Sequence, residues 1–221
     1  MRKYYFVLLI MIFVSCSKEF ANSTSDVNEA IQFYKLKGGT FYDNNTGLNL
    51  STANNLTNND YVKLKSLDFL VDLSLPKGIT DEIMNHVKYL EKLEVLRIDS
   101  SNITDNGLSK IGNLRKLRFI DLNSTKISDA SLLTIQKLPN IERIHLDYTK
   151  ISDGGLKNLI GSVNLYEISL NKTSITDKGL MFLSNIKSLR AINVLGTKVT
   201  LEGVNNFKKV MPNIDEINFD Y

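Results

Sequence analysis

A period of 24 residues is the feature that most limits how this chain can fold. The same pattern of apolar residues begins at five evenly spaced positions, namely Leu93, Leu117, Ile141, Leu165 and Leu189. Looser copies bring the total to seven to eight repeats over residues 48–221, and they begin at Leu48, Leu70 and Ile214. A unit this short cannot bury its apolar face alone, so neighbouring copies must stack. The chain is therefore expected to form a solenoid.

Each repeat predicts a short strand followed by a helix. The first six positions alternate, so that residues such as Leu96 and Ile98 point inward. A hydroxyl residue followed by Asp then predicts a helix start, because the hydroxyl oxygen accepts a backbone N–H and the carboxylate complements the helix dipole. This pair occurs at Thr104-Asp105, Ser128-Asp129, Ser152-Asp153 and Thr176-Asp177. Stacking predicts an α/β fold, a right-handed horseshoe segment with a parallel inner sheet of about eight strands and helices outside.

The repeat pattern LxxLxLxxTxITDxGLxxL resembles the leucine-rich repeats of the ribonuclease-inhibitor-like, cysteine-containing subtype. The resemblance covers residues 48–221, and five consecutive copies keep the whole pattern. Small hydroxyl residues replace the repeated cysteine of that subtype, at Ser101, Thr125, Thr149, Thr173 and Thr197. We expect each hydroxyl to form a hydrogen bond with the neighbouring turn.

Residues 1–15 have the features of an export signal. Two basic residues precede an apolar run at residues 4–14, which as a helix would measure about 16 Å, roughly half of a hydrocarbon core of about 30 Å. Residues 13–16 resemble a bacterial lipobox, and Cys16 is the only cysteine of the chain. The resemblance implies a bacterial lipoprotein with a signal peptide at residues 1–15 and a membrane anchor through lipidated Cys16. The alternative is an ordinary secretory signal with a cysteine near its cleavage site.

The lipobox also carries an expectation about location. Ser17, rather than Asp, follows the cysteine, and in enteric-type lipoproteins this goes with sorting to the outer membrane. We therefore expect a lipid-anchored protein of the bacterial cell envelope, in the outer membrane, facing either the periplasm or the exterior.

Two short segments connect the export signal to the repeats. Residues 16–25 comprise the lipidated cysteine and a polar tether. Residues 26–37 predict a helix with an apolar face that ends at Gly38-Gly39. A hairpin formed by residues 40–42 and 48–50 then leads into the first repeat. Residues 26–47 are thus expected to cap the N-terminal end of the repeat domain.

Composition excludes several kinds of function. The 27 basic and 24 acidic residues leave a net charge of only +3, which does not indicate binding to nucleic acid. Two histidines and one cysteine supply almost nothing for a zinc site or a cysteine nucleophile. Phosphate-binding and catalytic motifs such as HExxH, CxxC and GxSxG do not occur in the sequence. We therefore expect no enzymatic activity, no metal and no cofactor.

Strand residues that alternate with the core are expected to line the concave face of the solenoid in columns. We predict that a protein or peptide partner binds to this face, at Arg97, Asp99, Phe119, Asp121, Asn123, Arg143, His145, Asp147, Tyr148, Glu167, Ser169, Asn171 and Asn193. Among these, Phe119 and Tyr148 are candidate aromatic anchors.

One column has two possible roles. Asp99, Asn123, Asp147 and Asn171 form either a polar ladder for a ligand or a set of side chains that satisfy the backbone at the strand ends. Catalysis at His145 is a weaker hypothesis, because an open sheet offers no pocket to shift its pKa and no nucleophile.

The alternative function is structural. The last strand, within Glu216 to Asp220, has no helix after it, so the repeat ends or the convex helices could mediate self-assembly. The sequence does not choose between an edge that pairs and one that its acidic residues protect. His86 is expected on the outer side of a helix, in contact with solvent.

Overall fold

The computed structural model describes residues 24–220. The predicted signal peptide, the lipidation at Cys16 and most of the predicted tether therefore lie outside the described residues. Residues 24–36 are helical, so the N-terminal helix already includes the last two residues assigned to the tether. Ala30 and Tyr34 of this helix are buried, and Gly38 ends it with a left-handed φ of 88°. Among residues 24–220, no helix has the length and apolar content needed to span a bilayer.

The strands form one sheet in chain order, β1 to β9. A hairpin pairs β1 with β2 in antiparallel fashion, and from β2 onward every neighbouring pair is parallel. The predicted parallel sheet of eight strands is confirmed, with β1 as an added antiparallel strand. The strand bounds are β1 Thr40–Tyr42, β2 Gly47–Asn49, β3 Asp72–Ser74, β4 Val95–Arg97, β5 Phe119–Asp121, β6 Arg143–His145, β7 Glu167–Ser169, β8 Ala191–Asn193 and β9 Glu216–Asn218.

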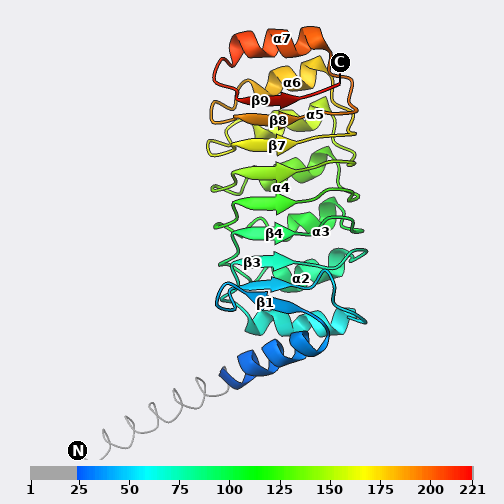
Figure 1. The fold of residues 1–221 in the computed structure, drawn as a ribbon, viewed down its shortest axis with the longest axis vertical. Coiled ribbons are helices and arrows are strands. Elements are labelled where there is room, and N and C mark those ends of the chain that lie inside the picture. Colours follow the sequence, from blue (N-terminus) through cyan, green and yellow to red (C-terminus); the bar gives the residue numbers. More distant parts are fainter. Residues whose placement is uncertain (1–23, 221) are drawn as a thin grey trace, which may run out of the picture.

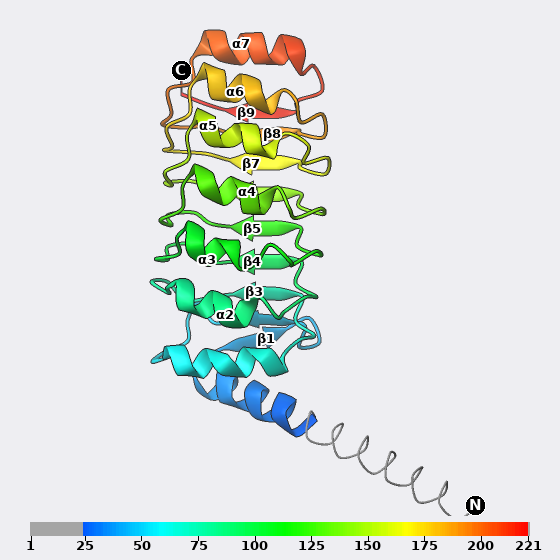
Figure 2. The ribbon, with the colours of Figure 1, turned by 180° about the vertical axis from the view of Figure 1, so that it is seen from behind.

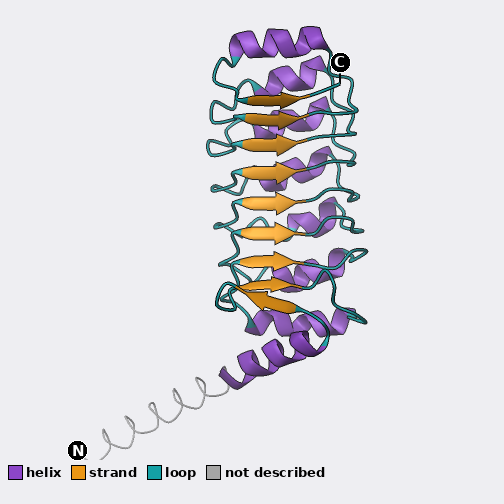
Figure 3. Ribbon diagram, viewed as in Figure 1, coloured by secondary structure: helices purple, strands orange, loops and turns teal. Residues whose placement is uncertain are grey.

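Short helices follow the strands and cover one face of the sheet (Figures 1 and 2). Their bounds are η1 Asn58–Ser66, η2 Asp81–Ile83, α2 Met84–Val87, α3 Asp105–Ser109, η3 Asp129–Ser131, α4 Leu132–Ile135, α5 Asp153–Leu156, η4 Lys157–Leu159, α6 Asp177–Leu183 and α7 Leu201–Val210. Figure 3 shows the other face of the sheet without helices in front of it. The molecule is an open α/β solenoid of stacked repeats.

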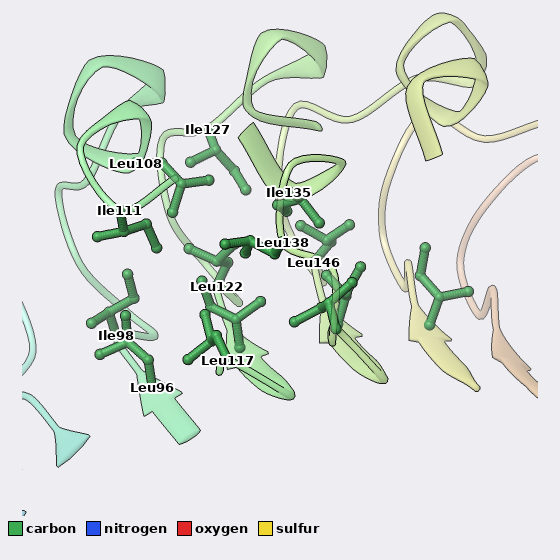
Figure 4. Close-up of a cluster of buried hydrophobic side chains, with 14 of the residues drawn as sticks. Leu96, Ile98, Leu108, Ile111, Leu117, Leu122, Ile127, Ile135, Leu138 and Leu146 are labelled. Atoms are coloured by element: carbon green, nitrogen blue, oxygen red, sulfur yellow. The ribbon is translucent and has the colours of Figure 1, made fainter. Parts of the chain in front are cut away.

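The core lies between the sheet and the helices. The middle residue of each parallel strand is in register with the next, as in Leu96, Ile120 and Ile144, and all three are fully buried. Leu108 and Ile111 of the helical segment reach down toward the strand residues (Figure 4). Each such side chain contributes about 1.5–3 kcal/mol on burial. The spacing of apolar residues therefore sets the layered arrangement.

The helical segments begin directly after the predicted hydroxyl residues, and three of these four residues form the expected capping hydrogen bond. The side chains of Thr104, Ser152 and Thr176 accept a hydrogen bond from the backbone N–H two residues later. Ser128 makes no such bond, and its helical segment begins with the 3-10 turn η3.

The aspartate after each hydroxyl also joins one repeat to the next. Thr176 of one repeat donates its backbone N–H and its hydroxyl to the two carboxylate oxygens of Asp153 in the repeat before, at 2.9 and 2.6 Å. The same double contact recurs along the molecule, and we call its acceptors the turn ladder: Asp81, Asp105, Asp129, Asp153 and Asp177. At Asp105 burial opposes ionisation, but hydrogen bonds from Ser128 and Ser131 outweigh it and lower the pKa of the carboxyl.

The turn ladder explains the glycine of the repeated motif. A Cβ atom on Gly155 would lie 2.5 Å from Oδ1 of Asp129 and 3.1 Å from its Cα atom. The equivalent position of the preceding repeat is Ser131, whose hydroxyl instead donates to Oδ1 of Asp105 at 2.5 Å. Close approach of the helix to the preceding turn therefore requires a very small residue or one that bonds to the aspartate.

The residues at the cysteine position bond within their own repeat. The buried hydroxyls of Thr125 and Thr149 donate to the carbonyl oxygens three residues earlier, of Leu122 and Leu146, at 2.7 and 2.5 Å. The predicted bond to the neighbouring turn is wrong. Among the described residues no backbone N–H donates to these two carbonyls, so the hydroxyl satisfies an acceptor that is otherwise buried without a donor.

Candidate functional site

The face of the sheet that the helices leave uncovered, here called the open sheet face, carries the predicted columns. Parallel register places Val95, Phe119, Arg143, Glu167 and Ala191 in one row across the strands. A second row consists of Arg97, Asp121, His145, Ser169 and Asn193. The predicted alignment is confirmed, while the role of these residues in binding stays a prediction.

Phe119 is the centre of a cluster on this face. The guanidinium carbons of Arg97 and Arg143 lie 5.6 and 4.9 Å from its ring centroid, and the ring of His145 meets it edge-on at 4.9 Å. These neighbours leave Phe119 only 7% exposed, so the expectation of an accessible aromatic anchor here is wrong. The two cations are held against the ring face by cation–π attraction.

Arg97 has a fixed acidic partner. Its Nη1 lies 2.6 Å from Oδ1 of Asp72 in the preceding repeat. Burial, together with the Asp72 carboxylate, raises the pKa of the neighbouring Tyr42 to about 12. Sequence reasoning missed Asp72 and Tyr42. Asp72 could have been found by aligning the repeat that begins at Leu70 with the next one. Although the spacing between these two repeats is one residue shorter, Asp72 occupies the position that Val95 has in the next repeat.

His145 lies between two carboxylates. Its Nε2 is 3.4 Å from Oε1 of Glu167, and its Nδ1 is 3.9 Å from Oδ2 of Asp121. The nearby Asp121 carboxylate, supported by that of Glu167 and opposed by burial, raises the pKa of His145 above its ordinary value of 6.5. His145 lies in neither of two pockets, of about 170 and 260 Å³, which are lined by residues of other parts of the molecule. The arrangement favours a protonated histidine, whose single positive charge offsets part of the charge of the two carboxylates.

The column at the strand ends serves the backbone. Oδ1 of Asn123 accepts the backbone N–H of Asp147 at 2.7 Å, and Oδ1 of Asp147 accepts that of Asn171 at 2.8 Å. Asn171 repeats the contact with the backbone N–H of Leu195 at 2.7 Å. We call Asn123, Asp147 and Asn171 the strand-end ladder. Of the two roles considered for this column, the structure favours satisfaction of the backbone. Asp99 is outside the ladder and accepts the hydroxyl of the next residue at 3.2 Å.

Two further predicted residues are also engaged within the sheet. Ser169 is buried and donates its hydroxyl to Oδ1 of Asp147 at 2.6 Å. Oδ1 of Asn193 accepts the side-chain amide of Asn218 at 2.6 Å. These two side chains therefore have few free hydrogen-bonding groups left for a partner.

Tyr148 is the accessible aromatic residue of the predicted set. Its side chain is 62% exposed, and its backbone is left-handed with a φ of 57°. Its N–H donates to the carbonyl of Asn171 in the next repeat at 2.9 Å. The backbone at Tyr148 is thus fixed while the ring remains exposed.

His86 differs from the expectation of a solvated side chain. It is half-buried, its Nδ1 is enclosed without a hydrogen-bond partner, and burial, with the nearby Lys65 and Lys88, lowers its pKa. Within residues 24–220, no group of three His, Cys, Asp or Glu side chains is placed to hold a metal ion.

Comparison with protein families identifies one repeat. Residues 89–112 match the family described as leucine-rich repeat, a segment that contains β4 and α3. No curated protein matches the chain.

Solved structures resemble the chain over most of its length. Internalin C2 of Listeria monocytogenes superimposes with a TM-score of 0.56 at 19% identity, covering 80% of this chain and 82% of the internalin. A leucine-rich-repeat protein of Leptospira interrogans superimposes with a TM-score of 0.51 at 18% identity, covering 72% of this chain and 39% of that protein. At these identities the likeness concerns the fold. Together with the nine-stranded sheet and its single layer of helices, it shows that this protein has the leucine-rich-repeat solenoid fold.

Proposed function

We propose that this protein is a non-enzymatic, envelope-anchored module that binds a protein partner through the open sheet face. One observation carries the proposal: no helix of residues 24–220 covers this face, and its side chains stand in rows at the register of the strands. Many of these side chains are already held by hydrogen bonds or ion pairs, so ordering them on binding costs little conformational entropy. A rigid face of this kind suits recognition of an extended segment.

Capture of a partner from solubilised envelope tests the proposal. The full chain is compared with a variant that carries Arg143→Glu and Tyr148→Ala, two exposed positions outside both ladders. Arg118→Glu with Tyr166→Ala is the matched control, because these two exposed side chains lie one residue before β5 and β7 rather than on the open sheet face. We expect the partner to be lost from the first variant and retained by the control. Equal retention by both variants would refute binding through this face.

Anchoring is part of the same proposal and is supported by the sequence of residues 1–16. Two acyl chains on Cys16 would make membrane attachment effectively permanent, since each buried CH₂ contributes about 0.8 kcal/mol. We expect Cys16→Ala to abolish labelling by a palmitate analogue and to release the protein from the membrane fraction. An ordinary secretory signal would leave labelling absent in both forms.

A structural role is the alternative. Within the described residues β9 pairs only with β8, and Leu201 and Val210 of the adjacent α7 are 52% and 47% exposed. An available strand edge beside apolar side chains favours pairing between chains. Light scattering over a wide concentration range distinguishes the two roles, since a strict monomer contradicts self-assembly.

A further inference from the structure

The charged side chains at the centre of the open sheet face differ in whether they already have a partner. Asp72 is paired with Arg97. Asp121 and Glu167 share His145. Among the described residues, Arg143 is the charged group of this cluster with no acidic side chain within 4 Å. The cluster therefore presents one guanidinium without an ion-pair partner, beside the Arg97–Asp72 pair and a histidine that two carboxylates share.

Arg143 is also fixed in place. Its guanidinium lies 4.9 Å from the centroid of Phe119, and Phe119 is in turn enclosed by Arg97 and His145. The Phe119 ring lies beside the guanidinium, and within the described residues no acidic side chain pairs with its N–H groups. Since Arg143 is exposed, an incoming group can reach those donors. A guanidinium held in this way loses less entropy on binding than a free side chain.

The neighbouring charges limit which anion fits. Asp121 and Glu167 carry two negative charges against the single positive charge of a protonated His145, so the surroundings of Arg143 retain a negative charge. A dianion such as phosphate would meet twice the repulsion that a singly charged group meets. A carboxylate carries one charge, and its two oxygens match the fork of the guanidinium.

We propose that Arg143 is the anchor of a carboxylate-binding site on the open sheet face, and that a peptide partner occupies it with one carboxylate. This inference rests on the proposed function and specifies the chemistry of the partner at one point of contact. The carboxylate comes either from an acidic side chain or from the C-terminus of the peptide.

Three short peptides distinguish these sources. The first is an acetylated and amidated pentapeptide with one central glutamate, the second has glutamine in its place, and the third has glutamine and a free C-terminus. Each is titrated into the isotope-labelled full chain while the Nε–H signals of the arginines and the backbone signals of the open sheet face are followed by NMR. We expect the Arg143 signal to shift with the first or the third peptide and to stay unchanged with the second.

Variants of Arg143 test its part in the binding. Arg143→Gln removes the charge, and Arg143→Lys keeps the charge but removes the planar fork of N–H donors. Arg118→Gln is the matched control, because Arg118 is an exposed arginine that pairs with Glu142 and Glu94. We expect Arg143→Gln to weaken carboxylate binding about tenfold, the effect of one charge-assisted contact, and Arg118→Gln to leave it unchanged. Because Arg143 is exposed, all of these variants should fold, which the backbone spectrum verifies.

Several results would overturn the carboxylate site. The glutamine peptide could bind as tightly as the glutamate peptide, or Arg118→Gln could weaken binding as much as Arg143→Gln. Peptide shifts confined to other residues of the open sheet face would refute the role of Arg143 while leaving binding through that face intact. Absence of any shift at millimolar peptide would also refute the carboxylate site, whereas the proposed function is tested separately by the capture experiment.

Discussion

The position of His145 in the second row of the open sheet face favours its protonated form. Its two ring nitrogens face Asp121 and Glu167, and only the protonated ring presents an N–H to each carboxylate. The pKa of His145 is therefore higher in the folded protein than in the unfolded chain. A raised pKa means that the native state binds the proton more tightly, so this contribution to stability is present below pH 6.5 and is lost as pH rises through the folded value.

The first prediction concerns the dependence of stability on pH. We expect the free energy of unfolding to fall as pH rises above 6.5 in the wild type, and this fall to disappear in His145→Gln. His86, the other histidine of the chain, gives the opposite sign, because its lowered pKa destabilises the native state as pH falls below 6.5. Urea unfolding at a series of pH values, with His86→Gln as the comparison, checks both signs.

The second prediction concerns a single carboxylate of the turn ladder. Asp153→Ala removes the acceptor of both the N–H and the hydroxyl of Thr176, and each bond to a charged group is worth about 1.5–3 kcal/mol. We expect a loss of about 3 kcal/mol in the free energy of unfolding. Glu91→Ala is the control, since Glu91 is exposed; equal losses in the two variants would contradict a special role for the ladder.

At the scale of the element, each helical segment is positioned by its contact with the preceding turn. Gly155 lies in the first turn of α5, where Asp129 leaves no room for a Cβ atom. The third prediction is that Gly155→Ala destabilises the protein by about 1–3 kcal/mol, because the helix must move away from the turn. At Gly112 an added Cβ would make only contacts of 3.7 Å or more, so Gly112→Ala should change stability little. Thermal unfolding of the two variants measures the difference.

Periodicity was sufficient to predict the strands, their order and the face of the helices that is buried. It could not predict which atoms reach from one repeat to the next. The Thr-Asp pair was expected to act within its own helix, whereas the aspartate also binds the following repeat. Similarly, alternation placed Phe119 on the open sheet face, but its burial depends on Arg97 and Arg143, which come from other strands. Such contacts depend on side-chain conformations across two repeats, which a pattern of residue types does not contain.

On the scale of the whole molecule, each repeat is stabilised by its two neighbours. Ile144 is fully buried between β5 and β7, whereas Ile217 of β9 is partly buried. The fourth prediction is that Ile144→Ala costs about 2–5 kcal/mol and weakens the coupling between the repeats on either side. Ile217→Ala should cost less and act only locally. Hydrogen exchange distinguishes them, because loss of protection confined to β6 in Ile144→Ala would contradict the coupling.

The overall architecture was predictable because it follows from one repeated constraint. The solenoid and the rows of the open sheet face follow from burying the same apolar positions in every copy, whereas turn signals ahead of the repeats predicted the N-terminal hairpin. The distribution of charge within the rows does not follow from that constraint. Arg97 has an acidic partner because of Asp72, a residue of a less regular copy.

The turn ladder separates the residues that join the repeats from those that face outward. Asp129 and Ser152 lie at the joint between two repeats, while Arg143 and Tyr148 of the intervening strand and turn are exposed. Mutations at such exposed positions can therefore accumulate without loosening the turn ladder. Because the same joint recurs in successive repeats, duplication or deletion of one whole period preserves every remaining contact of the ladder. An ancestral chain could in this way change its length and its specificity independently.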